Sequence, residues 1–381
     1  MLYQHAFFHI LFHSFLPKMR KNYICLMEST TAQKSLYRSQ NLDIIKGLGI
    51  VLVVLGHCGC PAKDFIYLFH MPIFFMASGY VLNSVYSDCF SKFGSLFRKR
   101  LKSLWLPSFF FNTLFLLLSP IFIKYSIYPE DVESPSFVSG ILLNALTYLK
   151  GGPLAGACWF LGTLFEVTII YTFVDYVLKR LHVKFREIVN FVFGLAMFIV
   201  SFYLIERGIR IHSIAEHIAG AYVVFAIGVL LKNVALNAIQ FKSWILIFVA
   251  TFAVLLVCNQ YGSVELSLGV YTSPWFYLLC AMAGWFLIYS VSVFLSKFSH
   301  VSNVLCFLGR NTVCIIGLHF LAFKIVTFLQ ICVYDLPHEK LSEFPYLIAE
   351  PFWWVAYTVV GLSVPLLLNA AWKKLPKSRF S

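Results

Sequence analysis

The sequence predicts an all-α protein, a polytopic membrane helix bundle of about ten transmembrane helices with both termini in the cytoplasm. Of its 381 residues, 60% are hydrophobic and only 12% are charged, and the mean hydropathy is +0.79. A soluble domain carries about a quarter of its residues as charges, so this composition excludes a soluble globular chain. Ten apolar stretches and a one-sided distribution of cations complete the prediction.

Each predicted span is a run of about 20 mostly apolar residues, the length that crosses a hydrocarbon layer of about 30 Å. In chain order the ten spans cover 43–60, 65–86, 104–124, 158–178, 188–205, 214–231, 243–258, 275–295, 311–330 and 346–371. The apolar segment 137–149 has only 13 residues before Lys150. It is too short to cross, and we expect it to lie at the surface or to re-enter.

Lys and Arg collect in cytoplasmic loops, whereas Asp and Glu are nearly indifferent to the side. With the N-terminus inside, 23 of the 30 cations fall in inner segments, and one, Lys324, falls within a span. The outer loops carry most of the carboxylates. The net charge of +13 therefore records the orientation of the chain in a lipid bilayer, and we expect no nucleic-acid partner.

The chain divides into an N-terminal extension, 1–40, and one membrane domain, 41–381. Residues 2–16 are apolar, but their cations follow rather than precede them, which is not typical of a signal peptide. We expect the extension to be poorly ordered or to lie upstream of a start at Met19 or Met27. A metal-binding or interfacial helix is the alternative, because three histidines recur at every fourth residue there.

The ten cysteines are scattered, mostly within spans. They form no C-x-x-C pair and no Cys/His spacing of the structural zinc type, so we predict apolar fillers and no metal site. Cys58 and Cys60 lie at the outer end of the first span and Cys158 at the outer end of the fourth. A disulfide between those ends is the less favoured alternative.

Lys46 and His57 are the most informative pair in the first span. They are 11 residues apart, so they share one helix face and are separated by about 16 Å. Between them Gly47, Gly49 and Gly56 allow another helix or a ligand to approach closely. An intramembrane histidine usually faces the bundle interior, where it makes a structural hydrogen bond or takes part in chemistry. The residues alone leave both roles open for His57.

The string Asp43-x-x-Lys46-x10-His57 resembles the signature of the acyltransferase-3 family of integral membrane O-acyltransferases. Four later segments resemble, in order, the family's second helix, its basic inner loop ending in Pro, the entry to its fourth helix and its ninth helix. They are 70–80, 98–107, 151–161 and 308–319. The resemblance runs from about Asn41 to the C-terminus. Lys46 replaces the Arg of many members, as in the branch of fucose 4-O-acetylases, which this chain resembles most.

The resemblance implies transfer of an acetyl or other short acyl group from cytoplasmic acyl-CoA to a hydroxyl of a cell-surface glycan or its lipid-linked precursor. It places the protein in a bacterial-type inner membrane, with acyl-CoA as co-substrate and no bound cofactor. His57 is the expected general base. The polyanionic coenzyme would meet a cluster of cations at the inner face. These cations are Lys46, Arg98, Lys99, Arg100 and Lys102, for which an anchor to anionic lipid is the alternative.

Four further polar or aromatic residues are candidates for the site. Glu166 is an intramembrane carboxylate that could orient His57 or the acceptor hydroxyl, or bond a neighbouring helix. His70, Trp159 and His319 match family positions and are predicted to contact the acceptor or to donate hydrogen bonds behind the site. A purely structural role is the alternative for both histidines.

The runner-up function is a transporter or flippase for lipid-linked sugars, because many of these are bundles of ten or more spans. Against it, the halves of the sequence show no repeat, and few charges lie within the spans. A glycan polymerase would have a larger outer loop than the longest one here, 125–157. A non-catalytic membrane scaffold is a further alternative, and the sequence leaves the oligomeric state open.

Overall fold

The computed structural model describes residues 40–129, 152–211, 217–234, 236 and 239–374. The predicted extension, apart from its last residue, and the segment 137–149 lie outside the described residues. The described chain is helical almost throughout, so the predicted all-α class is confirmed. Its strands are β1 (Val264–Glu265) and β2 (Val270–Tyr271), an antiparallel pair around the short 3-10 helix η6 (Leu266–Leu268).

Eight helices of the described chain are long and apolar enough to cross a membrane, which confirms an integral multi-pass protein. They are Gln40–His57, the continuous helix of α4 (Phe90–Arg100), η2 (Leu101–Trp105) and α5 (Leu106–Lys124), then η3 (Pro153–Cys158) with α7 (Trp159–Arg180), α8 (Arg186–Glu206), α10 (Phe241–Tyr261), α11 (Pro274–Leu295), α13 (Thr312–Tyr334) and α14 (Trp353–Lys374). Each falls on one of the ten predicted spans.

The second and sixth predicted spans are shorter helices. The second is divided into α2 (Lys63–Tyr67), α3 (His70–Tyr80) and the one-turn helix η1 (Ser84–Ser87), so the prediction of one continuous span is wrong there. The sixth is α9 (Ala219–Leu231). At 1.5 Å per residue α3 and α9 are only about 16 and 20 Å long, less than the hydrocarbon thickness. Their side chains are almost all buried, so their apolar sequences reflect burial inside protein.

α3 and α9 pack against each other with their backbones in contact. A Cβ atom at Gly79 would collide with the carbonyl oxygen of Phe225, and one at Gly228 would collide with that of Met76. Glycines at a crossing remove the side chains that would keep two helices apart. The crossing holds α3, the element that follows His57 and Tyr67, in a fixed place in the core.

The first helix makes a similar contact with α12 (Ser299–Arg310). A Cβ at Gly47 would collide with the carbonyl oxygen of Leu305, and one at Gly309 with that of Asp43. The close approach predicted for Gly47 is therefore confirmed, and the approaching group is a helix. This contact brings Arg310 next to the inner end of the first helix.

The basic segment 98–107 is helical, which corrects the expected inner loop. It lies inside the 35-residue helix Phe90–Lys124, whose length of about 52 Å exceeds the hydrocarbon thickness. A helix of this length extends beyond the hydrocarbon layer, and its first part carries most of its cations. Pro107 lies just after the π-helical turn η2, which adapts the backbone to the missing N–H of proline.

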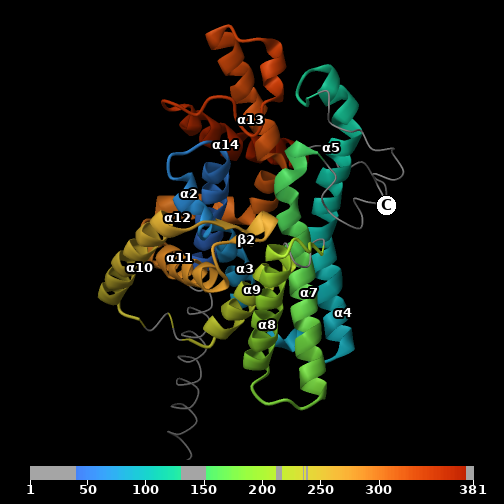
Figure 1. Ribbon diagram of the computed structural model, residues 1–381, viewed down its shortest axis with the longest axis vertical. Helices are drawn as coiled ribbons and strands as arrows, with labels where there is room; N and C mark the ends of the chain where they lie inside the picture. Colours follow the sequence, from blue (N-terminus) through green and yellow to red (C-terminus); the bar gives the residue numbers. More distant parts are fainter. Residues whose placement is uncertain (1–39, 130–151, 212–216, 235, 237–238, 375–381) are drawn as a thin grey trace, which may run out of the picture.

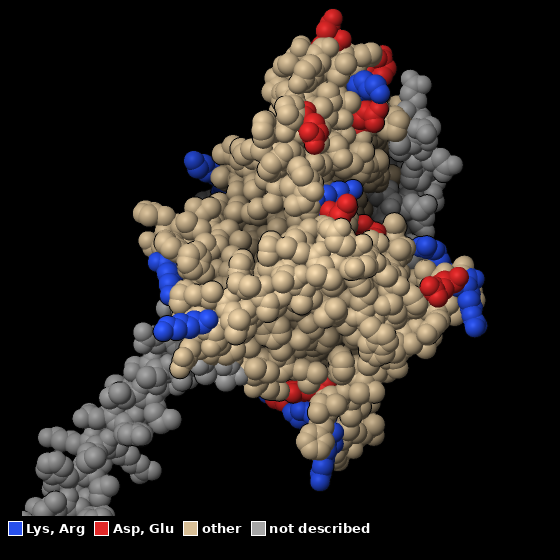
Figure 2. All heavy atoms as spheres, turned by 60° about the vertical axis from the view of Figure 1, so that its left-hand side comes forward, with Lys and Arg blue, Asp and Glu red and all other residues tan. Residues whose placement is uncertain are grey.

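The helices assemble around an aromatic core whose largest fully buried side chains include Trp285, Tyr222 and Tyr277. In Figure 1, α4 and α5 run along one edge of the molecule beside α7, and α13 with α14 forms the opposite end from the α7–α8 turn. Figure 2 shows a broad surface of uncharged residues with Lys, Arg, Asp and Glu mainly at its margins. Such a surface suits the hydrocarbon of a bilayer.

Candidate active site

The first helix ends at His57, and the chain reverses direction immediately after it. Gly59 has a φ of +73°, a left-handed conformation that glycine adopts without the strain of a Cβ. The reversal leads into α2, whose last residue is Tyr67, and α3 starts at His70. As a result the hydroxyl of Tyr67 lies 3.2 Å from Nδ1 of His57.

His319 reaches the same place from α13. Its ring is stacked on that of His57, with centroids 5.6 Å apart and planes inclined by 25°. The neighbouring Phe320 ring lies 4.9 Å from His57. Two residues that are 262 positions apart in sequence therefore share one site.

Hydrogen bonds fix the tautomer of His319. Its Nδ1 lies 2.9 Å from the carbonyl oxygen of Ile315 and 3.1 Å from that of Ile316. A carbonyl only accepts hydrogen bonds, so Nδ1 carries the proton and Nε2 carries the lone pair. That Nε2 is buried and has no hydrogen-bond partner among the described residues. Its lone pair is therefore not used by any hydrogen bond within the described part of the chain.

His57 has a choice of tautomer, because the Tyr67 hydroxyl can donate to Nδ1 or accept from it. When Nδ1–H donates to Tyr67, Nε2 carries the lone pair that a general base needs. His57 is half-buried, unlike the fully buried His319. The arrangement thus offers one imidazole whose orientation is set by a tyrosine.

His70 completes the cluster of three predicted histidines. Its Nδ1 bonds the carbonyl oxygen of Ile66 at 3.0 Å, and its ring lies 4.8 Å from that of Tyr67. The structure therefore brings His57, His70 and His319 together around Tyr67 and Phe320. Sequence reasoning missed Tyr67, because nothing in its spacing marks it as a partner of His57.

Glu166 and Trp159 lie apart from these contacts. Glu166 is half-buried on α7 and forms no hydrogen bond or ion pair with a described residue, His57 included. Trp159, the first residue of α7, stacks on the ring of His217 at 4.9 Å between centroids. The orienting contact expected between Glu166 and His57 is not present in this structure.

The predicted coenzyme-binding cations lie at the inner side in different settings. Lys46 approaches Asp43 at 3.7 Å, and Asp43 also pairs with Arg310 at 2.9 Å. Arg98 and Lys99 are exposed, whereas Arg100 is partly buried with an Nε that bonds no described residue. These four predicted cations therefore do not converge on one cavity.

A cavity of about 740 Å³ lies between α5, α13 and α14 and contains the fifth predicted cation. Lys102 lines it together with Arg310 and Lys373, and the wall continues along apolar side chains to Leu318. Leu318 immediately precedes His319. Because three cations line the cavity and most of its other side chains are apolar, it suits an anionic group with a long uncharged arm. From the sequence, Arg310 and Lys373 were only two of the 23 cations in inner segments, and no binding role was predicted for them.

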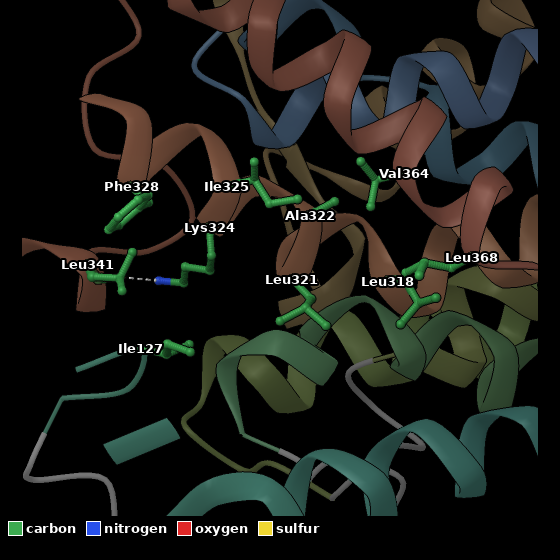
Figure 3. A pocket seen from close by; sticks show the side chains of 10 residues that line it. All are labelled: Ile127, Leu318, Leu321, Ala322, Lys324, Ile325, Phe328, Leu341, Val364 and Leu368. Atoms are coloured by element: carbon green, nitrogen blue, oxygen red, sulfur yellow. Dashed lines mark hydrogen bonds between the residues drawn. The ribbon is translucent and has the colours of Figure 1, made fainter. Parts of the chain in front are cut away.

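A second cavity of about 460 Å³ adjoins the first and shares Leu318 and Leu368 with it (Figure 3). Neither cavity is lined by Lys46 or His57. The helix face between those two residues is packed, because Val53 is buried and the Phe74 ring covers Gly49. A passage along the first helix is therefore closed in this structure.

The nine described cysteines are free thiols. Cys58, Cys60 and Cys158 are all buried, and the Cys58 sulfur lies 3.4 Å from the Thr358 hydroxyl. The alternative of a disulfide between the first and fourth spans is therefore wrong for this structure. Within the described ranges, no three His, Cys, Asp or Glu side chains are placed to hold a metal ion.

Comparison with known proteins gives one finding. A family model described as an acyltransferase domain matches residues 39–370, a range that contains the three histidines and Tyr67 and ends just before Lys373. No curated protein and no solved structure matches the chain significantly.

Proposed function

The chain belongs to the acyltransferase-3 family and is a membrane acyltransferase, and from this premise we propose its substrates and its base. The donor is cytoplasmic acyl-CoA that carries an acetyl or another short acyl group. The protein itself lies in a bacterial-type inner membrane. The acceptor is a hydroxyl of a cell-surface glycan or its lipid-linked precursor. The observation that carries the proposal is the half-buried His57 ring, oriented by Tyr67 and stacked on His319.

The proposed reaction is a direct transfer with His57 as general base. Nε2 of His57 takes the proton of the acceptor hydroxyl as its oxygen attacks the thioester carbonyl carbon. The new carbon–oxygen bond forms and the carbon–sulfur bond breaks. The proton then passes from the imidazolium to the departing coenzyme A thiolate. Tyr67 holds Nδ1 of His57 and so keeps Nε2 directed at the hydroxyl.

His319 is proposed to hold the acceptor. Its Nδ1–H is committed to two backbone carbonyls, so its Nε2 presents a lone pair next to His57. A sugar has several neighbouring hydroxyls, and one of them can donate to this nitrogen while another reacts at His57. Trp159 and His70 keep their predicted roles as further acceptor contacts, and Glu166 keeps only the predicted role of holding the acceptor hydroxyl.

The donor is proposed to enter through the cavity between α5, α13 and α14. The coenzyme phosphates would lie at Lys102, Arg310 and Lys373, and the pantetheine arm would follow the apolar wall to Leu318. Arg98, Arg100 and Lys46 would add positive potential at the inner face. A route for the donor along the first helix, from Lys46 to His57, is closed because that face is packed.

The test is acyl transfer by membranes that contain the protein, with labelled acetyl-CoA and the host's surface glycan precursors. We expect His57→Ala to lower kcat by about 10²- to 10⁴-fold, the usual contribution of a general base. His300→Ala is the matched control, because His300 is exposed on α12. Equal labelling by wild type and His57→Ala would show that His57 is not the general base. No acyl-CoA-dependent labelling by any variant would contradict the proposed substrates.

A further inference from the structure

Lys324 lies in the middle of α13 and is buried, with only 6% of its surface exposed. Its Nζ donates to the carbonyl oxygen of Leu341 at 2.8 Å and to that of Glu343 at 2.9 Å. Figure 3 shows the side chain reaching from α13 to the loop, with its stem and Leu341 at the edge of the smaller cavity. A buried ammonium group is costly unless it is hydrogen-bonded. The hydrogen bonds to these two carbonyl oxygens therefore compensate for the burial of the ammonium group.

The loop that receives these bonds contains the 3-10 helix η7 (His338–Ser342) and connects α13 to α14. The Glu343 side chain pairs with Lys340 instead of Lys324. Lys324 thus binds the backbone of the loop and not a carboxylate. Because hydrogen bonds from charged groups are stronger than neutral ones, this is a firm attachment.

Two other side chains hold the next part of the same loop. Gln330, also on α13, bonds both the carbonyl and the N–H of Ile348, at 2.7 and 3.2 Å. Tyr357 on α14 accepts from the N–H of Leu347 at 3.1 Å. The loop backbone is therefore attached to α13 and α14 from Leu341 to Ile348.

The attached loop borders the histidine site. Phe344 packs on Phe320 with centroids 4.7 Å apart, and Phe320 is the ring in contact with His57. Tyr346 packs against Gly59, in the turn that follows His57. The segment 341–348 is thus the wall of the site on the side where α13 and α14 are connected.

We propose that Lys324 is a positioning residue that fixes the segment 341–348 as the wall against which the acceptor sugar binds. The inference rests on the proposed function, because it takes His57 as the place where the acceptor hydroxyl reacts. Release of the wall moves Phe344 away from Phe320, the α13 ring that contacts His57. Acceptor binding then weakens, whereas the donor cavity at Lys102 and Arg310 is unchanged.

The attachment can be measured without activity, through trypsin cleavage after Lys340 in the purified full-length protein. Lys340 is exposed on η7, and Leu341 is buried beside Lys324. We expect Lys324→Met to be cleaved there about tenfold faster or more, because charged hydrogen bonds no longer hold the segment closed. Lys324→Arg retains donors for both carbonyls and should restore slow cleavage. Lys124→Met, at the exposed end of α5, is the matched control.

The positioning role is measured by steady-state kinetics on the same variants. Lys324→Met should raise the KM for the acceptor several-fold and leave the KM for acyl-CoA unchanged, and Lys324→Arg should recover most of the loss. Unchanged cleavage, or equal increases in both KM values, would overturn the proposal. If Lys324→Met does not fold, Gln330→Met tests the same wall through Ile348, with the same expected split. If cleavage accelerates but wild type transfers no acyl group, the attachment stands and the proposed function fails.

Discussion

At the scale of single residues, the site depends on a contact that sequence spacing does not encode. His57, His70 and His319 were identified through motifs that resemble those of a family, and the structure brings all three together. Tyr67 carries no such motif, and its contact with His57 exists only because the chain reverses at Gly59. The histidines could therefore be predicted, whereas the tyrosine that orients the base could not.

Removing the Tyr67 hydroxyl should affect catalysis and little else. Tyr67→Phe keeps the ring but loses the bond to Nδ1 of His57, which is worth about 1 kcal/mol, so we expect kcat to fall roughly fivefold. The KM for acyl-CoA should not change, because the donor cavity is elsewhere. Tyr334→Phe is the matched control, since it loses a hydrogen bond with Trp353 away from the site. Equal kcat values for the two variants would contradict the orienting role.

At the scale of elements, hydropathy located the helices but not all of their lengths. α3 and α9 are as apolar as the long helices, yet they are short and buried by other helices. A sequence window cannot distinguish an apolar helix surrounded by lipid from one surrounded by protein, because both environments exclude water. The helical segment 98–107 was expected to be a loop for another reason, because its charges exclude it from the hydrocarbon layer. Its charges signal the inner side, whatever its conformation.

The α3–α9 crossing predicts opposite effects for two glycine substitutions. Gly228→Ala places a methyl group against the carbonyl of Met76 and should destabilise the protein by about 1–3 kcal/mol, as overpacking does. Gly94 on α4 has open space around it. Gly94→Ala should therefore be neutral or stabilising by up to about 1 kcal/mol. Thermal unfolding in detergent measures both, and equal shifts for the two would contradict the contact.

At the scale of the whole molecule, the donor cavity is formed by cations that are far apart in sequence. Lys102, Arg310 and Lys373 belong to three different helical segments, and they meet because α5, α13 and α14 pack around one space. The positive-inside distribution put all three on the inner side. It did not distinguish them from Arg98, which the structure leaves exposed outside the cavity.

The two sets of cations give a direct comparison. Lys102→Gln combined with Lys373→Gln should raise the KM for acyl-CoA about tenfold or more, because each lost phosphate contact is a charge-assisted hydrogen bond. The KM for the acceptor should not change. Arg98→Gln removes a cation that contributes only potential at the same face, so it should raise the KM for acyl-CoA much less than the double substitution. A larger effect of Arg98→Gln than of the double substitution would indicate that the coenzyme binds near Arg98, as the sequence predicted, and not in the cavity.

The sequence by itself determined the class of the protein, the approximate positions of most helices and the identity of the three histidines. These follow from composition, from apolar runs of known length and from short motifs, all of which are local along the chain. The tertiary structure alone decided that Tyr67 orients His57, that Lys324 binds the loop near the site, and that Lys102, Arg310 and Lys373 share a cavity. Each of these contacts joins residues from different elements, and its existence depends on how the helices cross. Helix crossings are set by close packing, such as that at Gly79 and Gly228, and no local pattern specifies which distant backbone a glycine will meet.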